Sequence, residues 1–156
     1  MAFLTKDELK SVIRQHKVTH ISDSDDSIVE IAISAAVTEV SSRIAPNNKK
    51  TWNDGRLKYD IDAIFGAEGE DRNPLILELT KVIALWWLIL RCNAGVHYEV
   101  IRDRYEAAIE YLKDLASGEA NDPTLPQIEP PTDEQGNPIT SNPFVMGSRK
   151  KFNHEF

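Results

Sequence analysis

The stretch Asn73-Pro-Leu-Ile-Leu-Glu-Leu-Thr-Lys-Val-Ile-Ala-Leu-Trp-Trp-Leu-Ile-Leu-Arg-Cys92 determines more of the fold than any other part of this 156-residue chain. Asn73 is a good helix-capping residue and Pro74 suits the first helical position, so the pattern predicts a helix from Pro74 to about Cys92. Apolar side chains recur on nearly every side of this helix. A helix that is apolar all round lies at the centre of a bundle or at an interface between chains.

Three further helices are predicted around this apolar one. They cover about Thr5–Lys17, Asp25–Ile44 and His97–Ser117. Thr5 and Glu8 form a capping-box pattern at the start of the first helix, which is expected to fade near Gln15–Lys17. Gly118 can adopt the left-handed conformation that ends the last helix. The predicted fold class is therefore all-α, a small bundle of about four helices within a domain of residues 1–118.

Two segments do not fit this helical pattern. The long middle loop 45–72 carries Trp52, Tyr59 and Phe65, whose rings serve either local packing or a contact surface. The C-terminal segment 119–156 holds six of the eight prolines, so it is predicted to be an extended arm beyond the bundle domain. This arm begins acidic and ends basic and aromatic. An extended segment with three phenylalanines indicates that it lies on another protein.

Composition argues against several classes of protein. The net charge of −7 does not suit a general nucleic-acid binder, which needs a concentrated basic face. A single cysteine excludes an intrachain disulfide. The most apolar run, Val82–Leu90, is too short to span a bilayer, which needs about 20 residues. The N-terminus has no basic region followed by an apolar run, so a signal peptide is not expected.

No motif predicts catalysis, a cofactor or a metal. Asp23–Ser27 begins like a calcium loop, but Ile28 and Ser34 occupy the positions that need glycine and a bidentate glutamate. His16 and His20 are four residues apart, yet no third ligand lies nearby. Cys92 has no visible base to activate it. We therefore expect a protein that is not an enzyme.

The residues expected to bind a partner lie mainly at the basic, aromatic end of the arm. They are Phe144, Arg149, Lys150, Lys151, Phe152 and Phe156. Phenylalanine and arginine are frequent anchors of protein interfaces. Trp52, Tyr59 and Phe65 are weaker candidates for contacts with a neighbouring copy or with another protein. An alternative is a small helical regulatory protein that binds nucleic acid through its basic C-terminus.

The order of these features resembles a known family. Phe3-Leu-Thr-Lys-Asp-Glu-Leu9 is followed by an acidic turn, an alanine-rich helix, a variable loop and an apolar helix. Arg104-Tyr-Glu-Ala-Ala-Ile-Glu-Tyr-Leu-Lys-Asp-Leu-Ala-Ser-Gly118 carries most of the similarity, and Gly147-Ser-Arg-Lys-Lys-Phe152 resembles the family's ending. These stretches are similar to the phage Mu Gp36-like family of bacteriophage head–tail connector, or adaptor, proteins. The loop 45–72 and the apolar Trp86–Leu90 depart from the family pattern.

The resemblance implies a structural virion protein at the neck, where head and tail join. Its partners would be the portal protein, copies of itself in a ring that is commonly twelvefold, and tail or stopper proteins. Assembly would take place in the cytoplasm of the host bacterium. DNA would pass through the ring without specific binding, which suits an acidic body because negative charge does not hold phosphates. From the absence of cofactor motifs and of a long apolar run, we expect no cofactor and no membrane partner.

Overall fold

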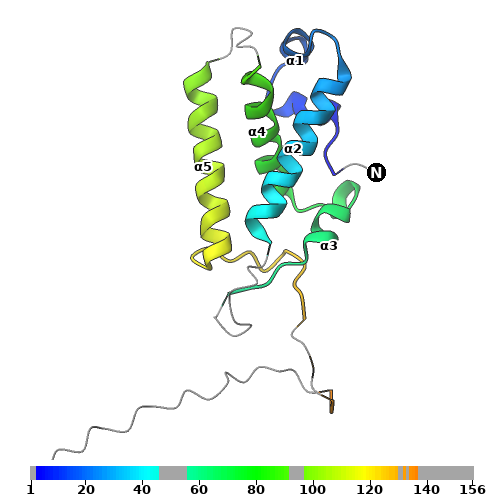
Figure 1. Ribbon diagram of the computed structural model, residues 1–156, viewed down its shortest axis with the longest axis vertical. Helices are drawn as coiled ribbons and strands as arrows, with labels where there is room; N and C mark the ends of the chain where they lie inside the picture. The colour runs from blue at the N-terminus through cyan, green and yellow to red at the C-terminus, as the bar shows by residue number, and fades with distance from the viewer. Residues whose placement is uncertain (1–2, 46–55, 92–96, 130–131, 133, 137–156) are drawn as a thin grey trace, which may run out of the picture.

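The structure is a computed structural model that describes residues 3–45, 56–91, 97–129, 132 and 134–136. Three long helices run side by side and form the bundle (Figure 1). They are α2 (Asp26–Ile44), α4 (Pro74–Ile89) and α5 (Tyr98–Ser117). Four shorter elements complete the described part: η1 (Lys6–Ser11), α1 (Gln15–Ser22), α3 (Ile61–Gly66) and η2 (Gly69–Asp71).

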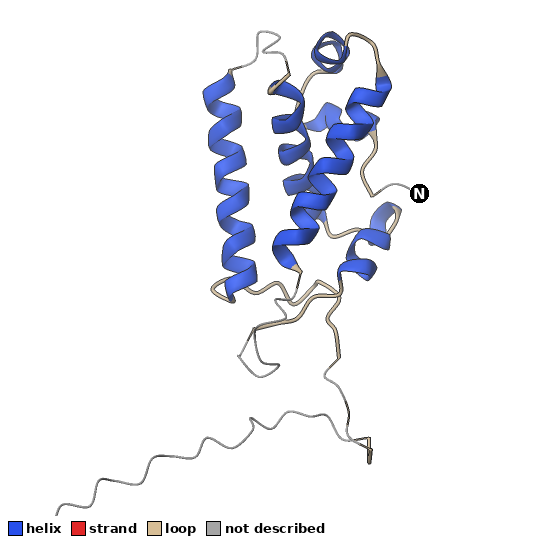
Figure 2. Cartoon of the chain, viewed as in Figure 1, coloured by secondary structure: helices blue, strands red, loops and turns tan. Residues whose placement is uncertain are grey.

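The predicted all-α class is confirmed over the described residues, which contain no strand (Figure 2). Their one named β-contact is an isolated antiparallel bridge between Tyr59 and Gln127. The prediction for α2 is accurate: Asp25 caps it by accepting a hydrogen bond from the amide of Ser27 at 2.9 Å. The Asn73-Pro74 start of α4 is also confirmed, since the Asn73 side chain accepts from the amides of Leu75 and Ile76.

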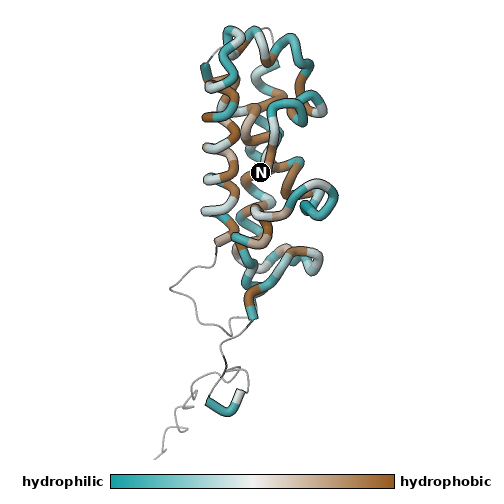
Figure 3. The backbone as a smooth tube through the Cα atoms, turned by 90° about the vertical axis from the view of Figure 1, so that its right-hand side faces the viewer, coloured by the Kyte–Doolittle hydropathy of each residue, from teal (hydrophilic) through white to brown (hydrophobic). Residues whose placement is uncertain are grey.

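The core lies where α4 meets α2 and α5. Helix α4 also contacts α1 and η1, so it is the central element of the bundle. Brown, hydrophobic positions recur along the helices in Figure 3. Ile76, Ile83, Leu88 and Leu112 are among the fully buried side chains. Each such burial stabilises the fold by about 1.5–3 kcal/mol before entropy is counted.

The N-terminal region differs from the prediction of one helix that fades near Gln15–Lys17. It forms two short helices, the 3₁₀ helix η1 and then α1, separated where Arg14 adopts an extended conformation. Because the chain changes direction between η1 and α1, two pairs of apolar side chains reach the core. The pairs are Leu9 with Ile13, and Val18 with Ile21. The single-helix prediction is therefore wrong, because α1 begins where it placed the end.

The middle segment is also more ordered than the predicted loop 45–72. Residues 46–55 lie outside the described part, but α3 and η2 occupy much of 61–71. The Asp60 carboxylate caps α3 by accepting from the amide of Ala63 at 3.0 Å. Ile64 then enters the core at 2% exposure. The capping aspartate and one buried isoleucine explain this short helix.

The first part of the predicted arm packs against the body. Leu125 is buried at 2% exposure. The amide of Asp60 donates to the carbonyl of Pro126 at 2.9 Å, and the amide of Ile128 donates to that of Lys58 at 2.8 Å. Residues 119–129 are not continuously extended, because the amide of Leu125 donates to the carbonyl of Asp122 in a turn, and they continue the domain. The contacts with the body extend past the predicted boundary at Gly118.

Candidate interaction surface

Glu39 joins the three long helices of the bundle. It lies on α2, and its carboxylate accepts hydrogen bonds from Tyr105 Oη of α5 at 2.9 Å and from Trp87 Nε1 of α4 at 3.1 Å. Arg43, one turn further along α2, adds an ion pair at 2.8 Å. Trp86 stacks on the ring of Tyr105, with centroids 5.0 Å apart. These contacts fix the relative positions of the helices and the orientation of Trp87.

The surroundings of Glu39 keep it ionised. Burial raises its pKa, but the hydrogen bonds from Arg43, Tyr105 and Trp87 outweigh this effect, and the pKa lies below its ordinary value. Burial and the bond to Glu39 raise the pKa of the Tyr105 hydroxyl, which therefore stays protonated and donates. The network holds a charged acceptor with three donors. Charge-assisted hydrogen bonds are stronger than neutral ones, so the Glu39 carboxylate helps to hold the three helices together.

Beside this network, α2 and α4 form a shallow groove at the surface. It has a volume of ≈ 590 Å³ and is lined by Ile31, Ser34, Ala35, Thr38, Glu39, Ser42 and Trp87. Ile31 is 68% exposed and Trp87 is 43% exposed, although both side chains are large and apolar. Tryptophan is enriched among residues that dominate binding energy at protein interfaces. Because the hydrogen bond to Glu39 already orients the Trp87 ring, this side chain loses little conformational freedom when a partner binds.

Two polar groups on the outer side of α2 already have hydrogen-bond partners within the helix, so this side can lose its water when a partner binds. We call Ile31, Ser34, Ala35, Thr38, Ser42 and Trp87 the α2 face. The hydroxyl of Thr38 donates to the carbonyl of Ser34 at 2.9 Å, and that of Ser42 donates to the carbonyl of Glu39 at 2.8 Å. Burial against a partner would leave these two donors satisfied. The small side chains also allow a close approach.

A second apolar groove lies on the other side of α2. Its volume is ≈ 500 Å³, and its walls come from the N-terminal segment, α2 and α3. Phe65 lines it together with Phe3, and the two rings meet edge to face with centroids 4.8 Å apart. Ser34 belongs to both grooves, so they adjoin along α2. Phe65 thus lies near the α2 face and is half-buried.

The other sequence-predicted contact residues fall elsewhere. Tyr59 lies in the core at 2% exposure, and its hydroxyl accepts a hydrogen bond from the amide of Asp122 at 3.0 Å. It offers almost no surface to a partner, because the segment 119–129 covers it. The remaining candidates lie outside the described residues: Trp52, Phe144, Arg149, Lys150, Lys151, Phe152 and Phe156.

Sequence analysis missed the α2 face. The sequence pattern places Ser34, Thr38 and Ser42 on a narrow polar side of α2, and it does not single out Trp87 among the apolar side chains of α4. A charged Glu39 among small and apolar residues was the available signal, since a partly buried acid needs donors to stabilise its charge. Which helix would supply them depends on tertiary packing.

The described residues show neither a metal centre nor a spanning helix. Among residues 3–45, 56–91, 97–129, 132 and 134–136, no three His, Cys, Asp or Glu side chains gather around a possible ion position. His16 and His20 do share α1, contrary to the expectation that the helix ends there, and both are exposed. Over the same ranges, no helix combines the length and apolar character that crossing a bilayer requires.

Comparisons with protein-family models, with curated proteins and with solved structures found no match to this chain.

Proposed function

We propose that this chain is a structural subunit of a bacteriophage head–tail connector, in which copies associate through the α2 face into a ring that docks on the portal. The sequence resemblance to adaptor proteins supports this assignment. The observation that carries it is the α2 face, where Ile31 and Trp87 are exposed beside hydroxyls that the helix itself satisfies.

The α2 face suits a contact between proteins better than a site for a small ligand. Glu39 is the one charged residue among those that line its groove, and that charge is already compensated by Arg43. An exposed isoleucine beside an exposed tryptophan forms an apolar anchor of the type found at the centre of interfaces. A ring of subunits would cover this surface. The portal, copies of this chain and tail or stopper proteins are the proposed partners.

The test introduces charge at the face without disturbing the core. Ile31→Glu changes a side chain that is 68% exposed, so the bundle should fold normally. Leu75→Glu is the matched control, because Leu75 is 41% exposed at the start of α4 and lies outside both grooves. Circular dichroism and thermal unfolding would verify that both variants fold.

The readout is assembly of the full chain on purified portal rings, by sedimentation and electron microscopy. The wild type and Leu75→Glu should form rings on the portal, whereas Ile31→Glu should lose most of this binding. Normal assembly of Ile31→Glu would exclude the α2 face as the interface. A wild type that neither binds portals nor self-associates in their presence would overturn the connector assignment itself.

A further inference from the structure

A second surface feature lies at the end of the bundle where α1 contacts α4 and where α5 begins (Figure 1). Here the structure has a pocket of ≈ 470 Å³, within the usual range for ligand sites. It is lined by Val12, Ile13, Arg14, Lys17, Leu85, His97, Val100, Ile101 and Arg104. We call this the basic pocket. It shares no lining residue with the α2 face.

The charge of the pocket is opposite to that of the chain. Arg14, Lys17 and Arg104 are positive, His97 adds an imidazole, and no acid is among the described lining residues. The whole chain, in contrast, has a net charge of −7. Within the described residues, neither Arg14 nor Arg104 forms an ion pair. A ligand with carboxylates would supply the missing counter-charge.

The start of α1 shows the same preference for an anion. The helix dipole favours acids in the first turn, yet Arg14 precedes α1, His16 and Lys17 lie in its first turn, and no acid lies there. His97 precedes α5 without forming a side-chain cap. Both helices contribute residues from their first turns to the pocket wall. This local conflict between sequence and helix is typical of a binding site.

The pocket is also lined by apolar side chains, so a ligand that fits it needs an apolar group as well as negative charge. Ile13, Leu85 and Ile101 are buried at the floor of the pocket, and Val100 is 50% exposed at its side. A phosphate alone would leave this apolar surface in contact with water. A peptide that carries acids next to an apolar side chain would bind both parts.

The chain itself contains a segment of this composition. Ile128 is 39% exposed, and Glu129, Asp133 and Glu134 follow it with no basic residue between them. We call Ile128–Glu134 the acidic segment. Its first residue, Ile128, is hydrogen-bonded to Lys58, and the neighbouring Arg56 is hydrogen-bonded to Ala116 at the C-terminal end of α5, opposite to the end with the basic pocket.

The Ile128 side chain cannot reach the basic pocket of its own copy. The hydrogen bond from the Ile128 amide to the Lys58 carbonyl holds this residue at the far end. Helix α5, with 20 residues, separates the two ends by about 30 Å, at 1.5 Å per residue. The segment must therefore come from another copy.

We infer that the basic pocket of one copy binds the acidic segment of a second copy, with Ile128 on the apolar floor and the carboxylates facing Arg14, Lys17 and Arg104. The inference deepens the proposed function, on which it rests, by naming a contact between subunits. A pocket that binds a different surface of its neighbour makes a head-to-tail contact, and such contacts generate rings when the rotation closes.

A labelled peptide of residues 126–136, Pro-Gln-Ile-Glu-Pro-Pro-Thr-Asp-Glu-Gln-Gly, tests the contact directly. It should bind the full-length chain saturably at low salt and more weakly at high salt, because screening weakens exposed charge pairs. Arg104→Glu should weaken binding about tenfold or more. Arg102→Glu is the control, since Arg102 is on the same helix, pairs with Asp103 and lies outside the pocket.

A charge swap provides the decisive outcome. A peptide with Glu129→Lys and Glu134→Lys should bind the Arg104→Glu chain better than it binds the wild type. The inference would be overturned if Arg104→Glu and Arg102→Glu weakened peptide binding equally. It would also be overturned if the wild-type chain did not bind the peptide. Arg104-dependent binding of duplex DNA in place of the peptide would likewise overturn it. Peptide binding needs no portal, so its failure is distinguishable from failure of the connector assignment.

Discussion

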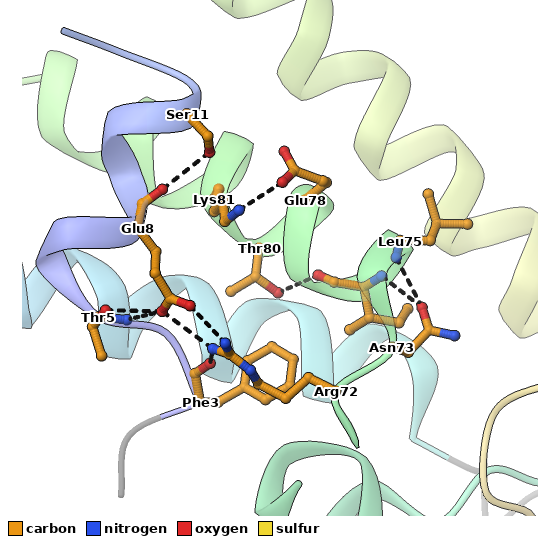
Figure 4. Close-up of polar contacts among 11 residues, drawn as sticks. Phe3, Thr5, Glu8, Ser11, Arg72, Asn73, Leu75, Glu78, Thr80 and Lys81 are labelled. Carbon is orange, nitrogen blue, oxygen red and sulfur yellow. Dashed lines mark hydrogen bonds and ion pairs between the residues drawn. The ribbon is translucent and has the colours of Figure 1, made fainter. Parts of the chain in front are cut away.

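Arg72 binds the carboxylate of Glu8 through two hydrogen bonds, Nη2 to Oε1 at 2.6 Å and Nη1 to Oε2 at 3.1 Å (Figure 4). The same guanidinium donates to the carbonyls of Phe3 and Gly69. Glu8 also accepts from the amide of Thr5 at 2.9 Å. The pair thus fastens the N-terminal segment to the residues that precede α4.

Replacing Glu8 tests how much this pair stabilises the fold. Glu8→Gln keeps a side chain that can accept from Thr5 but removes the charge that Arg72 binds. We expect the free energy of unfolding to fall by about 1–3 kcal/mol, as for hydrogen bonds to charged groups. Urea denaturation at pH 7 measures it. Glu70→Gln, an exposed acid for which no partner is identified, is the control and should be neutral. A neutral Glu8→Gln would mean that the pair contributes nothing.

The same pair predicts a pH dependence. The hydrogen bond from Arg72 lowers the pKa of Glu8 from 4.5 to about 2. Because the folded pKa is the lower one, the stabilisation is present above pH 4.5 and is lost as the pH falls toward 2. The difference in unfolding free energy between wild type and Glu8→Gln should therefore be constant from pH 7 to about 5.5 and shrink steadily below pH 4.5. Denaturation series at several pH values would check this, and a constant difference down to pH 3 would contradict it.

Two truncations test where the domain ends. Removing residues 119–156 deletes Leu125 and uncovers Tyr59, both of which are 2% exposed. We expect a loss of about 2–5 kcal/mol, the range for emptying a core position. A chain that ends after Glu129 keeps these contacts and should unfold at the wild-type temperature. Equal stability of the two truncated chains would place the boundary at Gly118 after all.

Gly118 is predicted to be required where it ends α5. Its φ of +87° is unfavourable for other residues, and an added Cβ would lie 2.7 Å from Cγ of Arg56. Arg56 cannot move freely, because its Nη1 donates to the carbonyl of Ala116 at 2.6 Å. Gly118→Ala should cost about 1–3 kcal/mol. Gly66→Ala, where a Cβ meets nothing within 4 Å, should cost less than about 0.5 kcal/mol. Thermal unfolding of the two variants gives the comparison.

Local signals predicted the long helices well. Asp25 and the Asn73-Pro74 pair mark starts by capping, and Gly118 marks an end by its left-handed conformation. Each of these signals acts within one helical turn, so the sequence is enough to recognise it. The short elements were harder. Helix α1 buries only two apolar side chains, Val18 and Ile21, and α3 buries one, so their periodicity is weak.

The sequence alone thus determined that the chain is all-α, that its most apolar helix lies at the centre of a bundle or at an interface, and that the last long helix ends at Gly118. Only the tertiary structure decided that the segment after Gly118 covers Tyr59, that Glu39 holds Trp87 at the surface and that Arg14 and Arg104 line one pocket. The physical reason is the range of the interactions. Caps and helical periodicity act between residues up to four apart, whereas these three arrangements involve residues 48 or more apart in the chain, which only packing brings together.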